Sequence, residues 1–345
     1  MPKAIPKLKD LPKPPPGKQG WPWTEESDPL PDQMPDGSPW PRISIVTPSY
    51  NQGNFIEETI RSILLQGYPN LQYIIMDGGS TDETVDIISK YEPWIDYWQS
   101  QEDQGQADAI NKGLELVNGE IFNWINSDDY LASNVLKLIG KSFKEESADV
   151  VAGACLNFWE GTNPNKEGKL AQVFNLDIRY MIYNWRNKYS RARLFRYHQP
   201  AVWLRTEGVK KCGGLDQNFH YFLDGDLIRR YLCLYNKVVY LNQVFVNFRY
   251  QNQSKTITNK NSEVNLFVTE QYQGIKKLKS LSQFSVAHPY CELYLREKEW
   301  ISQVHKIKNS KNIPIWLKKI KIIYLMLKDP KIRLSRFSLG TLIRN

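Results

Sequence analysis

Two adjacent carboxylates, Asp128 and Asp129, end the polar segment NSDD, residues 126–129, which directly follows an apolar stretch, residues 121–125, that we expect to form a strand. Carboxylate oxygens at a strand end can hold a divalent cation. Mg²⁺ and Mn²⁺ commonly use one or two such groups together with the phosphates of a substrate. Aspartate is also a favoured N-cap residue, so the pair could instead cap a helix that begins near Ala132. The residue types alone leave both interpretations open.

Polar residues also follow two earlier apolar stretches, as TPSYN at residues 47–51 and DGGSTD at residues 77–82. Gly78 and Gly79 allow the backbone to turn tightly and to approach a ligand. Asp77 could accept hydrogen bonds from a base or a ribose, and we expect Asp82 to cap the following helix. Because ligands of open α/β sheets bind beyond the carboxyl ends of the strands, these clusters and residues 126–129 predict one crevice.

A third polar segment, DQGQADAINKG at residues 103–113, leads into a predicted helix. Its start could be only a loop and a helix cap. A helix N-terminus beside carboxylates also suits a phosphate group. Lys112 could then add positive charge near a diphosphate, or it could extend into solvent.

The second half of the chain holds another pair of carboxylates, Asp224 and Asp226, in the sequence FLDGDLIRR. Residues two apart on a helix do not share a face, so the two carboxylates should have different roles. We expect Asp226 to cap the helix and Arg229 to pair with it. His198 could line a binding site, although a single histidine is more often structural.

The elements that must position these residues follow from the apolar spacing. Strands are predicted at residues 43–47, 71–76, 95–100, 121–125 and 148–152, and helices at 55–66, 81–90 and 106–117. Strands that alternate with helices of this length predict an α/β fold with a mostly parallel sheet and helices on both faces. The sequence contains neither GxGxxG nor GxxxxGK[ST], so neither a dinucleotide-binding fingerprint nor a P-loop is indicated.

The composition is that of a globular protein, with 345 residues, 41% hydrophobic and 24% charged. No apolar run approaches the roughly 20 residues that span a bilayer, and residues 1–10 lack the apolar stretch of a secretory signal. The four cysteines form no CxxC pair and fit a reducing compartment. These features predict a cytoplasmic protein.

The charge is concentrated at the C-terminus. Residues 301–345 hold 11 Lys and Arg against one acid, Asp329, which is a net charge of +10. Since the whole chain has a net charge of +8, the other 300 residues have a net charge of −2. This pattern does not predict a nucleic-acid-binding protein. Within the segment, apolar residues recur at helical spacing and would form one stripe of a helix. Lysines would lie on other parts of its circumference. The apolar residues are Ile313, Trp316, Leu317, Ile320, Ile323, Tyr324 and Leu327, and the lysines are Lys311, Lys318, Lys319, Lys321 and Lys328.

Such a helix could pack on the main domain or lie on an anionic membrane. Its charge favours peripheral binding at the inner face of the membrane. At the other end of the chain, residues 1–41 contain 12 of the 20 prolines. They predict either an extended arm or a disordered leader. Trp21, Trp23 and Trp40 favour an arm that docks on the domain.

Taken in order, the motifs resemble those of the family 2 glycosyltransferases, which are inverting enzymes with a GT-A fold. The resemblance covers about residues 42–256. It is carried by ISIVTPSYN, YIIMDGGSTDET, DQGQADAINKGL, WINSDD, HQPAVWLR, CGGLD, FLDGDLIRR and FRYQNQSKT. It implies a nucleotide-sugar donor, expected to be a UDP-sugar, and Mn²⁺ or Mg²⁺ as cofactor.

The proline content predicts an arm at 1–41, and the helical spacing and charge of the tail predict a helical, basic extension at 261–345. Between them, the resemblance implies a GT-A domain at 42–260 and its site residues. The GT-A domain divides into a nucleotide-sugar half, 42–154, and an acceptor half, 155–260. The implied donor-binding residues are Thr47, Pro48, Ser49, Asn51, Asp77, Gly79, Gln106, Asn111, Asn126, Ser127 and Asp128. Asp128 would face ribose and metal, and Asp129 would face metal and diphosphate. The catalytic base would be Asp224, and the acceptor side would hold His198, Gln199, Trp203, Asp226 and Arg229.

Two positions depart from the family pattern. Leu223 stands where many relatives have Glu before the base, and Gln251 stands where many have His after the last strand. Because an amide is a poorer ligand than an imidazole for metal or diphosphate, Arg249 or Lys255 could supply charge instead.

The implied function is transfer of a sugar to an acceptor hydroxyl by one inverting displacement, with Asp224 as general base. A carbohydrate or lipid-linked acceptor, as in polysaccharide or glycolipid assembly, is expected. Two alternatives remain at this stage. One is a sugar nucleotidyltransferase, although TPSYNQGN is not the glycine-rich, basic loop usual in those enzymes. The other is a non-catalytic, nucleotide-sugar-binding peripheral membrane protein.

Overall fold

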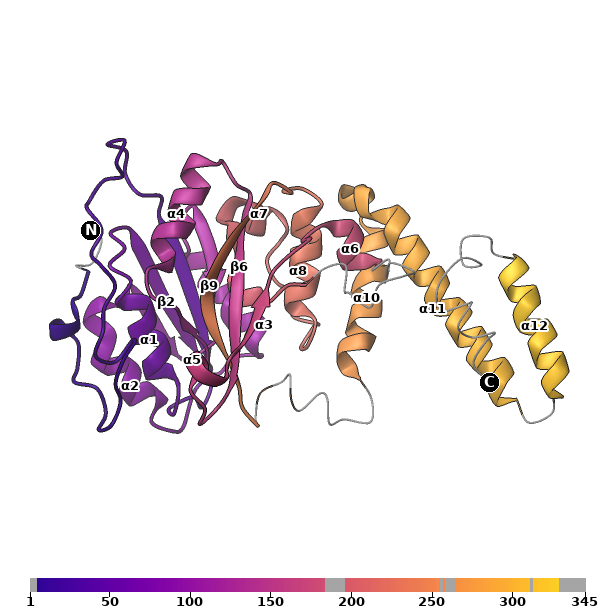
Figure 1. The fold of residues 1–345 in the computed structure, drawn as a ribbon, viewed down its shortest axis with the longest axis horizontal. Coiled ribbons are helices and arrows are strands. Elements are labelled where there is room, and N and C mark those ends of the chain that lie inside the picture. The colour runs from indigo at the N-terminus through magenta and orange to yellow at the C-terminus, as the bar shows by residue number, and fades with distance from the viewer. Residues whose placement is uncertain are drawn as a thin grey trace. The chain divides into compact units, whose positions relative to one another are not determined.

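A computed structural model describes residues 5–183, 196–252, 254, 257, 265–310 and 313–328 (Figure 1). Lys255, Lys311 and the basic residues after 328 therefore lie outside the described residues. The chain divides into two compact units, Met1–Leu176 with Arg196–Glu270, and Asp177–Phe195 with Gln271–Asn345. The predicted domain boundaries at 42, 154 and 260 stay predictions.

The first unit is built on a sheet in the order β3-β2-β1-β4-β8-β6-β9-β5, with β7 paired to β6. Among the described residues, six strands run in one direction and three run against them. The six are β1 (Ile43–Ser49), β2 (Leu71–Asp77), β3 (Tyr97–Ser100), β4 (Ile121–Trp124), β6 (Val150–Trp159) and β9 (Val238–Tyr250), and the three are β5 (Tyr130–Leu131), β7 (Lys169–Gln172) and β8 (Val202–Arg205). The predicted α/β fold with a mostly parallel sheet is confirmed.

Helices flank this sheet (Figure 1). The predicted apolar face of α1 is buried, and α3 lies so close to β1 that a side chain at Gly113 would meet Val46 at 2.6 Å. The helices of the first unit are α1 (Ile56–Leu64), α2 (Thr84–Tyr91), α3 (Gln106–Leu116), α4 (Val135–Glu145), α5 (Pro164–Glu167), α7 (Thr206–Lys211) and α8 (Leu223–Leu232). Short 3₁₀ turns occur at Leu8–Asp10, Glu92–Trp94 and Gln199–Ala201.

The proline-rich arm docks on the first unit, as its tryptophans predicted. Arg61 of α1 is fully buried and donates hydrogen bonds to the carbonyl oxygens of Pro12, Pro22 and Trp23 at 2.8, 3.1 and 3.0 Å. Its guanidinium also lies over the Trp23 ring. The carbonyls of the arm therefore satisfy a buried cation, whose burial would otherwise be costly.

The second unit is helical. Its elements are α6 (Ile178–Ile182), a 3₁₀ turn at Ser282–Ala287, α11 (His288–Asn309) and α12 (Ile315–Lys328), and α10 (Leu266–Ser280) runs into it from the first unit. Trp300 and Val304 of α11 form a buried cluster with Ile322 of α12. Within the described residues, no helix is long and apolar enough to cross a membrane.

Candidate functional site

The ends of β1, β2 and β3 lie at one edge of the sheet, because Ser49 pairs with Asp77 and Asp77 with Ser100. Asp77 is almost fully buried. Its Oδ2 accepts hydrogen bonds from the N–H groups of Gly79 and Ser80 and from the Ser100 hydroxyl, at 3.2, 2.8 and 2.6 Å. Gly79 has a φ of +82°, which favours glycine. Asp77 therefore shapes the turn after β2, and its contact with a base stays a prediction.

The loop after β1 is tied to that turn through Asn51, whose backbone N–H donates to Ser80 Oγ at 2.7 Å. The Asn51 side chain accepts from the Thr81 N–H at 2.9 Å. Thr47 is fully buried and accepts from the Tyr73 hydroxyl, and Pro48 is also buried. Ser49 differs, because within the described residues its buried hydroxyl has no hydrogen-bond partner. A buried, unsatisfied hydroxyl at this edge is a group that a ligand could satisfy.

Asp128 and Asp129 do not cap a helix. β5 follows them at Tyr130, and α4 begins only at Val135 with Asn134 as its N-cap residue. The helix-cap interpretation is therefore wrong. The two carboxylates lie in the short connection between β4 and β5, beside Asn126, whose side chain accepts a hydrogen bond from Gln106 Nε2 at 2.8 Å.

The two carboxylates have different surroundings. Asp128 is partly exposed, and its Oδ2 accepts from Gln251 Nε2 at 2.8 Å. Asp129 is 1% exposed, and its Oδ1 accepts from the Arg249 backbone N–H at 2.9 Å. Burial raises the pKa of both groups, and the neighbouring Asp128 raises that of Asp129 further. This pair of carboxylates would be stabilised by a cation. Within the described chain, no group of three or more His, Cys, Asp or Glu residues gathers around one point.

Arg249 is bound by other groups of the protein, and the expectation that it supplies charge to a ligand stays a prediction. Its guanidinium pairs with Glu58 of α1 at 2.5 Å, and its Nε donates to the Asp128 carbonyl oxygen at 3.0 Å. It also lies over the rings of Phe55 and Phe158. Arg249 therefore fixes the backbone of the Asp128 connection. Thr59 does the same, because its hydroxyl donates a hydrogen bond to the Asp129 carbonyl oxygen at 2.6 Å.

Two residues of α3, Lys112 and Asn111, also contact other groups of the protein. Lys112 pairs with Asp108 at 2.8 Å, beside a hollow of about 380 Å³ that Glu102, Asp103 and Gln217 also line. The Asn111 side chain exchanges two hydrogen bonds with the backbone of Leu215, at 2.8 and 2.9 Å. These contacts tie α3 to the segment before α8, and the role of Asn111 toward a donor stays a prediction.

Asp224 lies in the first turn of α8 and is half-buried. Burial raises the pKa of its carboxyl, although the Gly225 N–H donates to Oδ1 at 2.6 Å and Arg229 lies nearby. The Tyr197 hydroxyl is 3.3 Å from Oδ2. The carboxylate thus keeps a partly open side and has an increased proton affinity, which suits a general base.

Asp226 is not the helix cap that we predicted. Phe222 occupies the N-cap position, and Asp226 forms a buried ion pair with Arg230 at 2.6 Å. The Arg229 guanidinium lies 4.5 Å from the Phe222 ring centroid and donates to the Gly225 carbonyl oxygen. The side chain of Asp226 is therefore used to hold the helix.

The segment before β8 joins the two carboxylate regions. Gln199 donates to the carbonyl oxygen of Trp124 at 3.0 Å, at the end of β4, and Tyr197 contacts Asp224. Between them, His198 packs against the ring of Phe248, and burial lowers its pKa to about 4, so it is neutral near pH 7. Trp203 was predicted on the acceptor side, but it is fully buried in β8, so its ring belongs to the core.

Sequence reasoning missed Glu270, in α10. Its carboxylate accepts hydrogen bonds from three successive backbone N–H groups, those of His220, Tyr221 and Phe222, at 2.7–3.1 Å. These residues lead directly into α8 and Asp224. No local pattern marks Glu270, because its partners lie about 50 residues earlier in the chain.

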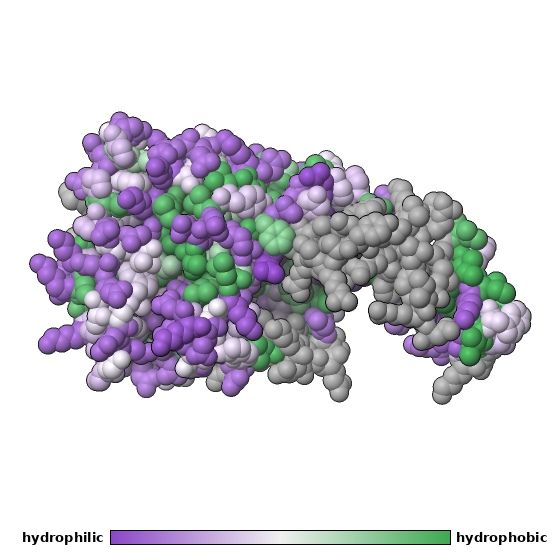
Figure 2. Space-filling view, viewed as in Figure 1, coloured by the Kyte–Doolittle hydropathy of each residue, from purple (hydrophilic) through white to green (hydrophobic). Residues whose placement is uncertain are grey.

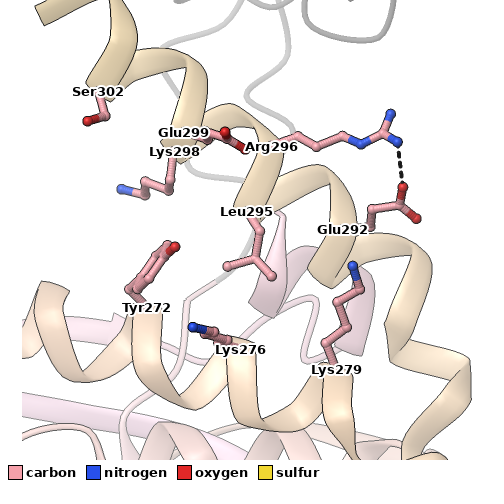
Figure 3. A pocket seen from close by; sticks show the side chains of 9 residues that line it. All are labelled: Tyr272, Lys276, Lys279, Glu292, Leu295, Arg296, Lys298, Glu299 and Ser302. Carbon is pink, nitrogen blue, oxygen red and sulfur yellow. Dashed lines mark ion pairs between the residues drawn. The ribbon is translucent and has the colours of Figure 1, made fainter. Parts of the chain in front are cut away.

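A larger hollow, of about 600 Å³, lies within the second unit between α10 and α11 (Figure 3). Figure 3 shows Lys276 and Lys279 on one side and Lys298 on the other, with Arg296 paired to Glu292 at 2.7 Å. None of the predicted donor or acceptor residues lines it.

Comparison with known proteins gives one family and one fold. GlyG of Streptococcus pneumoniae serotype 4 is 32% identical over 121 residues, which cover 34% of this chain and only 40% of that protein. The structure of S. aureus TarS 1–349 in complex with UDP-GlcNAc superposes with a TM-score of 0.57 at 15% identity, covering 88% of each chain. The mannosyltransferase PcManGT of Pyrobaculum calidifontis, in complex with GDP-Man and Mn²⁺, gives 0.53 at 16% identity, covering 93% of this chain and 89% of that one.

Residues 44–203 match the family described as Glycosyl transferase family 2. The match begins inside β1 and ends inside β8. It therefore spans the strands whose ends carry the polar clusters, whereas Asp224 lies beyond it. On this match, residues 44–203 belong to glycosyl transferase family 2.

Proposed function

We propose that this protein is an inverting glycosyltransferase that moves a sugar from a nucleotide-sugar donor to an acceptor hydroxyl. One observation carries the proposal: the segment 197–199 joins the end of β4, next to the Asp128 connection, to Asp224 at the start of α8. The reaction requires a site for the donor diphosphate, which we place beside the Asp128 connection, and a general base, which we assign to Asp224.

In the proposed step, an acceptor oxygen attacks the anomeric carbon while the bond from that carbon to the diphosphate oxygen breaks. The acceptor proton passes to the Asp224 carboxylate. A positioned base contributes about 10²–10⁴-fold in rate, and alignment of donor and acceptor supplies much of the remainder. A single displacement inverts the anomeric configuration. The raised pKa of Asp224 supports this role, because it brings the proton affinity of the carboxylate closer to the working pH.

Asp128 fits as a ligand of Mn²⁺ or Mg²⁺, with Asp129 behind it. It is a partly exposed carboxylate next to a buried one, and burial raises the pKa of both, so a cation bound there would stabilise their charged forms. When bound there, a divalent cation would neutralise charge on the departing diphosphate. The Mn²⁺ in the complex of PcManGT supports this assignment. The UDP-GlcNAc in the complex of TarS and the GDP-Man in that of PcManGT support a nucleoside-diphosphate sugar as donor, and we propose a UDP-sugar.

The donor would lie along the ends of β1 and β2. The unsatisfied hydroxyl of Ser49 lies at the end of β1, and Asn51 lies in the loop that follows. Gln106 donates a hydrogen bond to Asn126, in the connection that carries Asp128. His198, neutral near pH 7, can exchange hydrogen bonds with a sugar on the acceptor side. We propose a carbohydrate or lipid-linked acceptor.

A thermal-shift panel of UDP, GDP, dTDP and CMP, with and without Mn²⁺, tests the donor site. A ligand at 100 times its dissociation constant should stabilise the fold by about 2.7 kcal/mol. We expect a Mn²⁺-dependent shift with UDP that is lost in Asp128→Asn. Absence of any nucleotide-dependent shift would contradict the proposal.

Product analysis distinguishes the alternatives. Transfer to an acceptor releases a nucleoside diphosphate, whereas a sugar nucleotidyltransferase releases pyrophosphate. Nucleotide binding without either product, over a panel of lipid-linked and free saccharides, would favour a non-catalytic binding protein.

A further inference from the structure

Helix α12 carries apolar residues on two opposite sides. One side packs on α11, where Ile322 is 4% exposed in a cluster with Trp300 and Val304, and Leu325 packs against the same cluster. Lys318 lies on this side too, and its ammonium group donates to the Lys308 carbonyl oxygen at 2.7 Å. The orientation of α12 on α11 is therefore fixed by packing and by a hydrogen bond.

The opposite side of α12 is exposed. Trp316 is 64% exposed, Tyr324 62% and Leu327 60%, and Ile320 and Ile323 are exposed as well. At 3.6 residues per turn, these five side chains fall within about 100° of the helix circumference. Figure 2 shows apolar side chains at the surface of this helix. We call these five residues the α12 stripe.

Lysines border the stripe on both sides. On the same wheel, Lys319 lies on one flank, and Lys321 and Lys328 lie on the other. The sequence from 315 to 328 contains no Asp or Glu. Elsewhere in the same unit, the hollow between α10 and α11 is lined by four cationic side chains and two acidic ones (Figure 3).

We propose that the α12 stripe docks on an anionic phospholipid surface, with α12 lying in the plane of the membrane interface. An apolar stripe bordered by lysines is the pattern of interfacial helices, in which apolar side chains enter the acyl boundary and ammonium groups reach the headgroups. Trp316 and Tyr324 are the residue types that favour this interface.

Charge decides between a membrane and a second copy of this chain. Two copies joined through their stripes would bring the bordering lysines of both helices together, and α12 offers no acid to pair with them. Anionic headgroups supply the missing negative charge. The inference does not depend on the sugar-transfer chemistry, because it concerns α12 alone.

Vesicle flotation of the full chain tests the proposal. We expect the protein to float with vesicles of phosphatidylcholine containing a quarter phosphatidylglycerol, and much less with phosphatidylcholine alone. Ile320→Glu combined with Leu327→Glu should lower the bound fraction about tenfold or more, because each substitution removes an apolar side chain from the stripe and adds a charge. Val286→Glu is the matched control, since Val286 is also exposed but lies outside α12. It should leave binding unchanged.

Several results would overturn the proposal. One is equal flotation with neutral and anionic vesicles, and another is equal loss of binding in Val286→Glu. A third is a concentration-dependent dimer, seen by sedimentation, that dissociates in the Ile320→Glu, Leu327→Glu variant without any vesicle binding by the wild type. That result would assign the stripe to contacts between copies. Circular dichroism of each variant checks that the helices remain folded.

Discussion

Gln251 donates a hydrogen bond from Nε2 to Asp128 Oδ2 at 2.8 Å, across 123 residues of sequence. Many relatives are expected to have a histidine at the position of Gln251. In the proposed metal site, the amide would orient the Asp128 carboxylate, which is the proposed ligand, and would not bind the cation itself. Gln251 is buried and directly follows β9, whose backbone at Arg249 also holds Asp129.

Gln251→Ala should weaken Mn²⁺ binding in the presence of UDP by about 10–100-fold, the usual cost of removing a residue that orients a metal ligand. The measurement is a Mn²⁺ titration followed by thermal shift at a fixed UDP concentration. Asn252→Ala, at the exposed neighbouring position, is the control and should leave the titration unchanged. Unaltered Mn²⁺ affinity in Gln251→Ala would separate this amide from the metal site.

Much of the fold can be predicted from local patterns. The strands expected at 43–47, 71–76 and 121–125 appear within about two residues of their ends, because each is a short, mostly apolar segment rich in strand-forming residues. The helix expected from residue 81 begins at Thr84, because Ser80 and Thr81 take part in the turn that Asp77 and Asn51 organise. The apolar spacing did not predict β5, β7, β8 or the 13-residue β9. The first three are only two to four residues long, whereas the apolar pattern of β9 is interrupted by Asn242 and Gln243.

The candidate site, like the fold, could be predicted only in part from the sequence. The strand-end clusters could be located, because parallel strands bring their carboxyl ends to one edge. The partners of these residues could not, because Arg249 meets Glu58 across 191 residues and Glu270 meets Phe222 across 48. Such contacts depend on the packing of the whole unit.

Asp224→Asn should abolish transfer while leaving UDP binding nearly intact, because the amide preserves the shape but cannot take the acceptor proton. The expected loss is about 10²–10⁴-fold in kcat. Isothermal titration with UDP and Mn²⁺, beside a product assay, measures both properties. Asp226→Asn is the comparison variant, and it should lower stability because it breaks the buried pair with Arg230. Parallel loss of UDP binding and transfer in Asp224→Asn would point to a structural role.

The pH profile gives a second test of Asp224. Burial raises its pKa, so the carboxylate takes up a proton at a higher pH than an ordinary aspartate, whose value is 3.8. Activity should therefore fall as the pH decreases, with the midpoint of the acid limb of kcat/KM above 3.8. The residual activity of Asp224→Asn should lack this limb. An unchanged acid limb in the variant would assign the titration to another group.

Glu270 is expected to act as a positioning residue for Asp224. Glu270→Ala leaves three backbone N–H groups without their acceptor, so the segment 220–222 and the start of α8 should shift. We expect kcat to fall by up to about 10²-fold, with the dissociation constant of UDP unchanged. Glu270→Gln keeps one carbonyl oxygen and should recover part of the activity. A loss of thermal stability with unchanged kcat would make Glu270 purely structural.

Arg61 is predicted to hold the proline-rich arm. Arg61→Met would leave the carbonyl groups of Pro12, Pro22 and Trp23 without their donor. Each buried group left unsatisfied costs about 1–3 kcal/mol, so the midpoint of urea unfolding should fall clearly. Residues 5–41 should also become susceptible to limited proteolysis, because the arm loses its main anchor.

Lys141→Met is the matched control for this change of charge. Lys141 lies exposed on α4 and pairs only weakly with Glu145 at 3.7 Å, so its removal should cost less than about 1 kcal/mol. If Arg61→Met matches this control in stability and leaves the arm protected, the hydrogen bonds from Trp21 Nε1 to the Leu131 carbonyl oxygen and from Trp23 Nε1 to the Glu58 carboxylate must hold the arm in its place. A double variant, Arg61→Met with Trp21→Phe, would then release it.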